Sequence, residues 1–282
     1  MKYKLICMDM DGTLLNDKKE VSERAKVAIS KAHKLGVKVV IATGRIFVSA
    51  EYYGDVIGVK APIIASNGAY VREKDSDRSI YEEGLGYENY DLVVQMLNKY
   101  NIVPHFYTED TIYTGKLVHS SLAYKKANKT LPSNRQVKIE VVNDWSKFFI
   151  EKQPRIIKAM AVSEDKEKII NAKNEFIKLN KFQVVSSMKN SFEVMAKSTS
   201  KGKALKKLCD FYDIDRNEII SIGDNENDIS MIKFAGLGVA MGNAEEVVKN
   251  IADYITDTNE DDGVAKVIEK YIINEGSTQI DL

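Results

Sequence analysis

The sequence has 282 residues, and its 41 lysines and arginines balance its 41 aspartates and glutamates, so the formal net charge is zero. A chain of this length exceeds the usual single domain, and we expect one large or two medium domains. The balanced charge does not indicate a nucleic-acid-binding or membrane-surface protein, and no stretch approaches the roughly 20 apolar residues of a membrane span.

The first predicted element is a short apolar strand at residues 5–8, which leads into Asp9, Asp11 and a turn at Gly12 and Thr13. An uninterrupted apolar run is typical of a central parallel strand that is buried on both faces. An Asp-Gly turn alone would account for Asp11, but it does not explain a charge at Asp9, directly after a buried strand. Two carboxylates this close need a cation nearby or a proton on one of them. Ligand sites of open α/β sheets lie at the carboxyl ends of strands, so the pair predicts a functional site.

A second strand with a polar end follows. We expect a helix at residues 22–35 and a strand at residues 37–42, which ends in Thr43, Gly44 and Arg45 before the next helix. A hydroxyl and free backbone N–H groups at a helix start suit a phosphate oxygen. Thr43 could also serve only as a helix cap.

A third strand at residues 62–66 and a hairpin of residues 69–71 with residues 80–82 complete this part of the chain. The alternation of strands and helices predicts an α/β fold with a Rossmann-like, doubly wound parallel sheet.

From about residue 84 the composition changes, because aromatic residues and lysines become more frequent and the predicted strands become short. A helix followed by two strands is predicted twice, which indicates a separate α+β unit inserted into the first domain. We expect the insertion at residues 84–189 and the catalytic core at residues 1–83 and 190–282. The predicted elements of the insertion are helices at 91–100 and 164–179, and strands at 105–107, 112–114, 155–162, 182–187 and 192–195.

From residue 198 the first pattern returns. Lys201 precedes a helix at residues 203–212, and a strand at residues 219–222 ends in the acidic segment of residues 223–228. Oxygen-rich side chains suit a hard cation such as Mg²⁺. A helix-capping loop rich in Asp and Asn is a common alternative, but three strands that end in matching polar sets favour a site. A further strand at 237–241 and a closing helix at 264–271 are also predicted.

The two cysteines, Cys7 and Cys209, fall in a predicted strand and a predicted amphipathic helix. We expect both to be small core residues and not a disulfide, which fits a reducing, cytoplasmic setting. The apolar run near the N-terminus is interrupted by Asp9, too soon for a signal peptide.

Four polar motifs occur in an order that resembles the phosphatases of the haloacid dehalogenase (HAD) superfamily. They are DMDGT at residues 9–13, Thr43-Gly44-Arg45, Lys201 before a helix, and Gly223-Asp224 with Asn227-Asp228. The long insertion, together with Asn67-Gly68 and Gly242-Asn243, resembles the Cof-type branch (subfamily IIB), whose α/β cap of the C2B type sets substrate specificity. The resemblance covers essentially the whole chain.

The resemblance implies that Asp9 is a nucleophile that forms an aspartyl phosphate. It implies that Asp11 protonates the leaving oxygen and later deprotonates the attacking water. Asp11 must then carry a proton at the first step, so its surroundings should raise its pKa above the usual value of about 3.9.

The same resemblance implies that Mg²⁺ is held by Asp9, Asp224 and the backbone carbonyl of Asp11, with Asp228 as a further metal candidate. Thr43, Gly44, Lys201 and Asn227 would hold the phosphate oxygens. Whether Asn227 or Asp228 orients Lys201 or the metal shell stays open.

Three functions fit these residues. The first is a Mg²⁺-dependent phosphatase of small phosphorylated metabolites, with sugar phosphates first and flavin or pyridoxal phosphates as alternatives. The second is a phosphomutase of hexose phosphates that uses the same aspartyl phosphate. The third, a non-catalytic module that binds phospho-ligands, is disfavoured because every catalytic position carries a competent residue. We expect a small phosphorylated molecule as the only partner, with no nucleic acid or membrane, and a monomer or small homo-oligomer.

Overall fold

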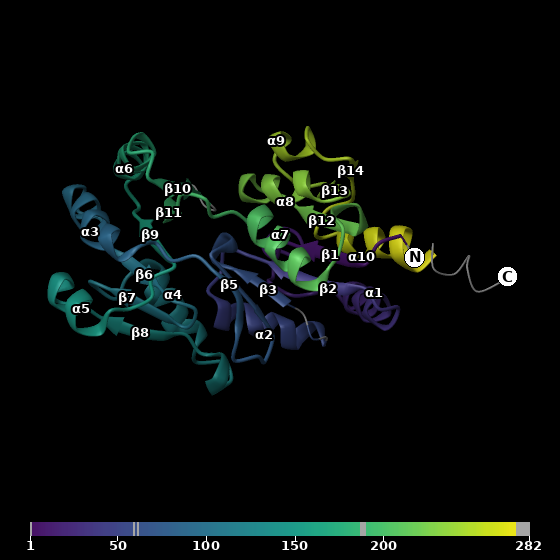
Figure 1. Ribbon diagram of the computed structural model, residues 1–282, viewed down its shortest axis with the longest axis horizontal. Helices are drawn as coiled ribbons and strands as arrows, with labels where there is room; N and C mark the ends of the chain where they lie inside the picture. Colours follow the sequence, from purple (N-terminus) through teal and green to yellow (C-terminus); the bar gives the residue numbers. More distant parts are fainter. Residues whose placement is uncertain (1, 59, 61, 187–189, 275–282) are drawn as a thin grey trace.

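The computed structural model describes residues 2–58, 60, 62–186 and 190–274. Two β-sheets with their own helices lie side by side along the longest axis of the molecule (Figure 1). The eight-stranded sheet and its helices are called the core below, and the six-stranded sheet with helices α3 to α6 is called the cap.

The core sheet has the order β14-β13-β12-β1-β2-β3-β4-β5. Strands from β14 to β3 are parallel to their neighbours, and β4 and β5 add an antiparallel hairpin. The predicted α/β fold with a doubly wound parallel sheet is therefore confirmed. Its strands are β1 (Leu5–Met8), β2 (Lys38–Ala42), β3 (Pro62–Ala65), β4 (Tyr70–Glu73), β5 (Ser79–Glu82), β12 (Ile219–Gly223), β13 (Leu237–Ala240) and β14 (Tyr254–Ile255).

The strand order reverses between β1 and β12, because the chain proceeds from β1 toward β3 on one side and from β12 toward β14 on the other. The two strands pair in parallel with Leu5 opposite Ile219. Their carboxyl ends therefore meet at the point where open α/β sheets bind ligands.

Helices cover both faces of the core sheet. Along β1, Ile6 and Met8 belong to the apolar cluster shared with α1 and α10, whereas Leu5 and Cys7 pack with α7 and α8. Cys7 and Cys209 are both free and buried, as predicted. The core helices are α1 (Glu23–Lys34), α2 (Phe47–Ile57), α7 (Lys201–Tyr212), α8 (Ile229–Phe234), α9 (Glu246–Lys249) and α10 (Gly263–Ile268), the last continued by a π-helical segment (Glu269–Ile273).

The cap sheet has the order β10-β11-β9-β6-β7-β8. Helices α3, α5 and α6 contribute to the apolar cluster on one of its faces. Its elements are α3 (Tyr90–Lys99), β6 (His105–Tyr107), β7 (Thr111–Thr114), α4 (His119–Ala127), β8 (Lys138–Val141), α5 (Trp145–Lys152), β9 (Lys158–Val162), α6 (Lys166–Lys178), β10 (Phe182–Val185) and β11 (Ser191–Ala196).

Three of these elements, α4, β8 and α5, were not predicted from the sequence. Helix α4 buries only Ser121 and α5 buries only Phe149, so neither shows the apolar periodicity of a typical amphipathic helix. Strand β8 has no buried residue and is recognised only through its parallel pairing with β7.

The predicted end of the insertion is too early. Residue 189 itself, like the end of the strand predicted at 182–187, lies outside the described residues. However, β11 pairs with β10 and β9 and belongs to the cap sheet, so the cap sheet extends to Ala196. The reason is packing, because Phe192 and Val194 are buried in the apolar cluster of the cap.

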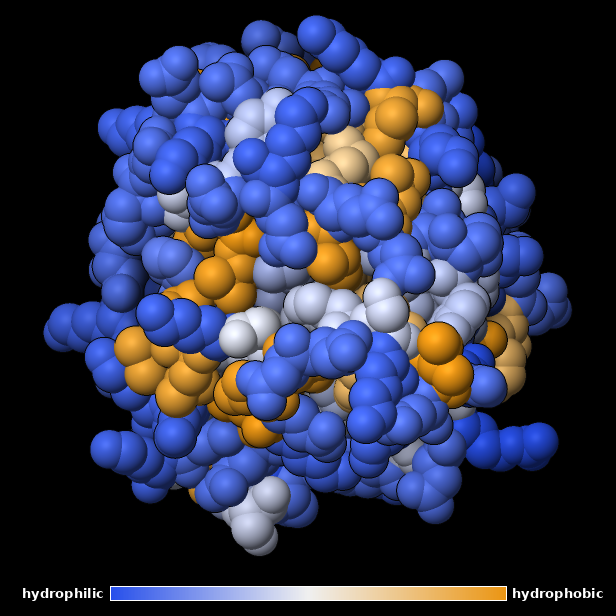
Figure 2. All heavy atoms as spheres, turned by 90° about the vertical axis from the view of Figure 1, so that its left-hand side faces the viewer, coloured by the Kyte–Doolittle hydropathy of each residue, from blue (hydrophilic) through white to orange (hydrophobic). Residues whose placement is uncertain are grey.

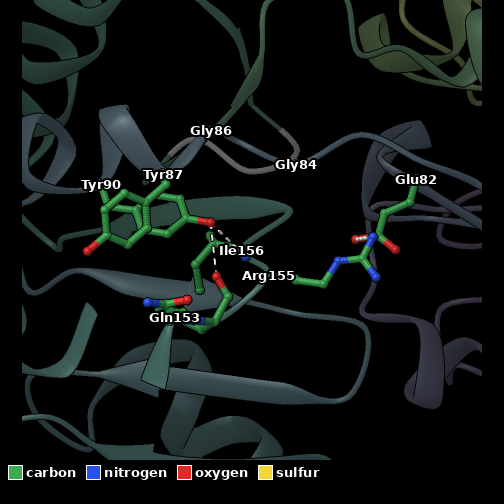
Figure 3. A pocket seen from close by; sticks show the side chains of 9 residues that line it. Glu82, Gly84, Gly86, Tyr87, Tyr90, Gln153, Arg155 and Ile156 are labelled. Carbon is green, nitrogen blue, oxygen red and sulfur yellow. Dashed lines mark hydrogen bonds and ion pairs between the residues drawn. The ribbon is translucent and has the colours of Figure 1, made fainter. Parts of the chain in front are cut away.

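The first connection between the two sheets borders a cavity of about 580 Å³, shown in Figure 3. The backbone N–H of Leu85 donates to the Ile156 carbonyl at 2.8 Å, and Arg155 pairs with Glu82 at 2.9 Å. The Tyr90 hydroxyl donates to the Pro154 carbonyl at 3.0 Å. None of the residues in the predicted functional site lines this cavity, so we assign the connection a structural role.

The cap also contacts the core directly. Ile46 and Val48 of the core share an apolar cluster with Tyr107 and Met160 of the cap. No helix among the described residues has the length and apolar character that crossing a bilayer requires. The cap end of the molecule has a mainly hydrophilic surface with separate hydrophobic groups (Figure 2).

An ionic cluster around Arg135 of the cap adds to this contact. The Arg135 guanidinium lies 3.1 Å from Glu51, 2.8 Å from Asp55 and 2.7 Å from Asp75, all three in the core. Arg135 and Glu51 are both buried. We propose that the cap is a separate unit, joined to the core by two short connections and held closed partly by this cluster.

Replacing Arg135 by alanine tests this proposal. Arg135→Ala removes the nearer cation of the buried Glu51 and leaves that carboxylate with Arg72 at 3.7 Å, so the Arg135→Ala protein should favour an arrangement that hydrates Glu51. We expect a larger radius of gyration in small-angle X-ray scattering. Lys138→Ala is the matched control, because Lys138 pairs with Asp110 inside the cap. Identical scattering from the Arg135→Ala and unsubstituted proteins would contradict the proposal.

Candidate active site

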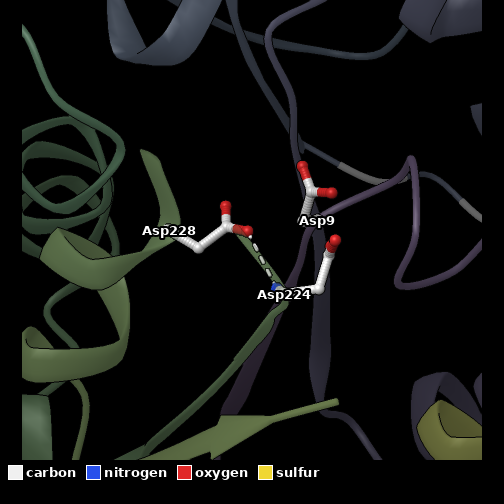
Figure 4. A group of neighbouring side chains, drawn as sticks. All are labelled: Asp9, Asp224 and Asp228. Atoms are coloured by element: carbon white, nitrogen blue, oxygen red, sulfur yellow. Dashed lines mark hydrogen bonds between the residues drawn. The ribbon is translucent and has the colours of Figure 1, made fainter. Parts of the chain in front are cut away.

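Three acidic side chains meet at the carboxyl ends of β1 and β12 (Figure 4). Asp9 follows β1, Asp224 follows β12, and Asp228 lies in the short helical turn after β12. Each offers a carboxylate oxygen, and these oxygens lie within 4.8 Å of one another. All three residues are buried. The sheet therefore brings together acidic residues from two distant segments of the chain.

The fully buried Lys201 lies between two of these carboxylates. Its ammonium donates to Asp9 Oδ1 at 2.5 Å and to Asp228 Oδ1 at 2.6 Å. Burial acts to lower the pKa of Lys201, but the charges of Asp228 and Asp9 outweigh it and raise that pKa, so the side chain stays charged.

The backbone around Lys201 is packed closely enough to need a glycine. Lys201 is the first residue of α7, and Ser200 caps this helix by accepting from the backbone N–H of Lys203. At the next position, a Cβ on Gly202 would lie 2.3 Å from the backbone oxygen of Ser230. Gly202 therefore allows α7 to approach α8, which keeps Lys201 beside Asp228.

The carboxylates carry more negative charge than Lys201 neutralises. Burial raises the pKa of Asp9 well above its usual value, against the opposing charge of Lys201. Burial and the nearby Asp228 raise the pKa of Asp224 to about 6. A divalent cation at this position would relieve the repulsion among the carboxylates.

The two candidates for orienting Lys201 differ in their contacts. Both oxygens of Asp228 are engaged, because Oδ1 accepts from Lys201 and Oδ2 accepts from the backbone N–H groups of Asp224 and Asn225 at 3.0 and 3.1 Å. Asn227 instead donates from Nδ2 to Asn67 Oδ1 at 3.0 Å. The contacts therefore favour Asp228 as the residue that orients Lys201.

The turn after Asp11 also holds Asp224. Gly12 has a φ of +89°, and a Cβ there would lie 2.5 Å from Asp224 Oδ2. The Thr13 hydroxyl donates to Asp224 Oδ1 at 2.8 Å. The glycine is therefore needed both for the backbone conformation and for the close approach of the two strand ends.

Thr43 and Gly44 lie at the end of β2 and line a cavity of about 580 Å³ together with Asp9, Asp11 and Asn227. The Thr43 hydroxyl accepts a hydrogen bond from the backbone N–H of Arg45 at 3.1 Å, as a capping residue would. The structure thus brings all the predicted phosphate-binding residues except Lys201 onto one cavity wall, and Lys201 contacts that wall through Asp9.

The expected effect on the pKa of Asp11 is wrong. Arg45 donates to both oxygens of Asp11, each at 2.8 Å, and Lys19 donates at 3.0 Å. Burial acts to raise the pKa of Asp11, but the hydrogen bonds and charges of Arg45 and Lys19 lower it to about 2. Asp11 is therefore ionised in this arrangement. Arg45 stands in a recognised motif, but no pattern in the sequence pairs it with Asp11.

Sequence reasoning missed two cap residues that reach the site. Lys158 of β9 donates to the backbone oxygen of Gly44 at 2.6 Å and pairs with Glu193 of β11 at 3.2 Å. Asn67 donates to the same Glu193 oxygen at 2.5 Å. The sequence signal for these two residues was weak: each is a charged residue within a predicted apolar strand, Lys158 in residues 155–162 and Glu193 in residues 192–195.

Comparison with known proteins agrees with this geometry. The family model for haloacid dehalogenase-like hydrolases matches residues 6–268. The phosphatase YwpJ of Bacillus subtilis is 31% identical over 282 residues, covering 94% of this chain and 99% of its own. The 5-amino-6-(5-phospho-D-ribitylamino)uracil phosphatase YcsE of the same organism is 32% identical over 271 residues, covering 96% of both chains.

Solved structures show the same fold. A haloacid dehalogenase-like hydrolase from Bacteroides thetaiotaomicron has a TM-score of 0.82 at 32% identity, and one from B. subtilis has a TM-score of 0.83 at 30% identity. Each alignment covers 95% of this chain and 99% of the other. The match over nearly the whole length, with phosphatases as relatives, shows that the chain belongs to the haloacid dehalogenase superfamily as a phosphatase of the Cof type.

Proposed function

We propose that the protein is a Mg²⁺-dependent phosphatase that hydrolyses monoesters of small phosphorylated metabolites through an aspartyl phosphate. The observation that carries this proposal is the position of Asp9. Its carboxylate ends a buried strand, contacts Lys201 and lines a cavity that also contains Thr43 and Gly44.

In this proposal Asp9 is the nucleophile. Its free carboxylate oxygen attacks phosphorus, the bond to the leaving alcohol oxygen breaks, and water later hydrolyses the acyl phosphate. One difficult displacement is thereby divided into two easier ones. Lys201, Thr43, the backbone N–H of Gly44 and Asn227 would hold the phosphate oxygens. Phosphoryl transfer depends mainly on such positioning and charge stabilisation.

Asp11 would give a proton to the leaving oxygen and take one from water in the second step. With a pKa of about 2 it cannot carry that proton while Arg45 and Lys19 are bonded to it. The proposal therefore requires that Asp11 leave these partners before it acts as an acid.

The carboxylates fit a magnesium ion. Hard oxygen ligands suit Mg²⁺, and burial together with the nearby charge of Asp228 raises the pKa of Asp224. We propose Asp9, Asp224 and the backbone carbonyl of Asp11 as the protein ligands, with Asp228 as a residue that positions Lys201. When bound, the ion would neutralise charge on the transferring phosphoryl group.

Sugar phosphates are the proposed substrate class. The relative YcsE is named as a phosphatase of a phospho-ribityl compound, whose phosphate is carried by a sugar alcohol chain. The cytoplasmic setting and a monomeric or small homo-oligomeric state stay predictions.

The crowded carboxylates of the proposed metal site should make the free energy of unfolding of the metal-free protein depend on pH. The pKa of Asp224 is raised from 3.8 to about 6, so the folded protein holds this proton more tightly than the unfolded chain does. Stability should therefore fall as the pH rises from 4.5 to 6, by at most roughly 1.4 kcal/mol per pH unit from this group. The raised pKa of Asp9 acts in the same direction.

Thermal unfolding with a chelator should show this fall, and Asp224→Asn should reduce it. At pH 7, added MgCl₂ should raise the melting temperature of the unsubstituted protein and not that of Asp224→Asn. Asp213→Asn, at an exposed position, is the matched control. A melting temperature that is insensitive to Mg²⁺ would argue against a metal at these carboxylates.

The activity itself has a direct test. With MgCl₂ the protein should release inorganic phosphate from p-nitrophenyl phosphate, lose that activity in excess EDTA and regain it when Mg²⁺ is restored. With hexose phosphates as substrates, free phosphate indicates a phosphatase, whereas an isomerised sugar phosphate would indicate the phosphomutase alternative. Full activity in excess chelator would exclude the metal-dependent mechanism.

A further inference from the structure

The cavity that contains Asp9 is lined on its other side by residues of the cap. The phosphate-binding end of the cavity belongs to the core, so the group esterified to the phosphate must lie against the cap. The cap residues that line the cavity are Tyr107, Ser120, Ala123, Tyr124, Lys158, Met160 and Glu193.

Glu193 is an unusual residue on this wall because it is a carboxylate that is only 3% exposed. Its Oε2 accepts from Asn67 at 2.5 Å and from Lys158 at 3.2 Å. Within the described parts of the chain, no hydrogen bond to Oε1 is found. Glu193 lines the cavity, and Oε1 has acceptor capacity that no described protein group uses, so this oxygen is suited to accept a hydrogen bond from a bound molecule.

Lys158 determines which kind of donor fits. Its ammonium pairs with Glu193, donates to the Gly44 carbonyl at 2.6 Å and lies 4.8 Å from the centre of the Tyr107 ring. It neutralises Glu193, so the pair has no net charge. A cationic donor would be repelled by Lys158, and an anionic group would bring a second negative charge toward Glu193 Oε1. A neutral hydroxyl group meets neither penalty.

The neighbouring side chains suit a hydroxylated carbon chain. The Tyr107 hydroxyl lies 2.8 Å from Ser120 Oγ and 3.4 Å from Met160 Sδ, and it has one proton for the two, so the Ser120 hydroxyl keeps a proton or a lone pair for a bound molecule. Tyr124 and Met160 add apolar surface to the same wall. Alternating hydroxyl and C–H groups, as in sugars and sugar alcohols, match this combination of polar and apolar contacts.

We propose that Glu193, held in place by Lys158 and Asn67, is a specificity-determining residue. It selects phosphate monoesters whose leaving group is an uncharged polyhydroxy compound, by accepting a hydrogen bond from one of its hydroxyl groups at Oε1. The inference rests on the proposed phosphatase function and adds to it the residue that recognises the leaving group.

The test compares substrates and variants under the same MgCl₂ conditions. The neutral polyhydroxy probes are ribose 5-phosphate, ribitol 5-phosphate and glucose 6-phosphate. The hydroxyl-free probe is p-nitrophenyl phosphate, and the anionic probes are fructose 1,6-bisphosphate and 6-phosphogluconate. The variants are Glu193→Gln and the control Glu140→Gln, an exposed glutamate on β8 of the same sheet. Thermal unfolding of each variant establishes that it is folded.

The unsubstituted protein should prefer at least one neutral polyhydroxy ester to both anionic probes. Glu193→Gln should lower kcat/KM for that ester by about tenfold or more, since hydrogen bonds to charged groups are among the strongest. The same variant should change kcat/KM for p-nitrophenyl phosphate by less than about threefold. Glu140→Gln should leave both values unchanged.

An equal loss on both kinds of substrate would overturn the proposal, because Glu193 would then be merely structural. Two other outcomes would overturn the proposal for Glu193 while the proposed phosphatase function stands. Both include Mg²⁺-dependent hydrolysis of p-nitrophenyl phosphate; in the first the protein prefers the anionic probes, and in the second it does not hydrolyse the neutral esters. This comparison needs only the unsubstituted protein, so it holds even where Glu193→Gln does not fold. No hydrolysis of any probe would refute both proposals.

Discussion

The site depends on one buried ammonium group, that of Lys201, which holds two carboxylates from different strand ends. Taking Lys201, Asp9 and Asp228 out of water is costly, and the cost is offset only because each charge contacts an opposite one at close range. Removing Lys201 would leave two buried carboxylates without their shared cation, whereas removing either carboxylate would leave Lys201 with one partner. The contact thus fixes the carboxyl end of β1 relative to β12 and to the start of α7, and the cavity floor takes its shape from these three elements.

A second constraint comes from the surplus of negative charge beside this contact. Burial and the nearby charge of Asp228 raise the pKa of Asp224 to about 6, yet the turn at Gly12 and Thr13 keeps Asp224 in place. The buried carboxylates repel one another in this arrangement, and a bound cation would reduce that repulsion. Asp11 has the opposite electrostatic environment, because the cations Arg45 and Lys19 donate hydrogen bonds to its carboxylate. Asp9 and Asp11 therefore have opposite surroundings, because burial raises the pKa of Asp9, whereas Arg45 and Lys19 lower that of Asp11. This difference suits different roles in one reaction.

Much of the core could be predicted from the sequence because its signals are local. Asp9 follows an apolar strand, Asp224 follows another, and parallel strands of an open sheet end at one edge. The cap was harder to predict. Helix α4 buries only Ser121 and therefore lacks apolar periodicity, and β11 is recognised as part of the cap only through its pairing with β9.

Long-range side-chain contacts were also beyond the reach of sequence patterns. Nothing near Arg45 in the chain indicates that its guanidinium holds Asp11 and reverses the expected pKa shift. Likewise, Lys158 and Glu193 occur on separate strands of the cap, and their meeting with Gly44 and Asn67 depends on how the cap rests on the core. Sequence motifs locate the residues of the candidate site, whereas the packing of the two sheets determines which side chains surround them.

The most direct measurement of the central proposal is the location of the phosphoryl group on the enzyme. In the proposed mechanism, Asp11→Asn would keep the nucleophile and remove the base of the second step, a contribution typically worth about 10²- to 10⁴-fold. Acid-quenched Asp11→Asn protein, mixed with p-nitrophenyl phosphate and Mg²⁺, should carry one phosphoryl group that peptide mass spectrometry assigns to Asp9. The Asp9→Asn protein should carry none. A phosphoryl group on any other residue, or its accumulation in Asp9→Asn, would contradict the role assigned to Asp9.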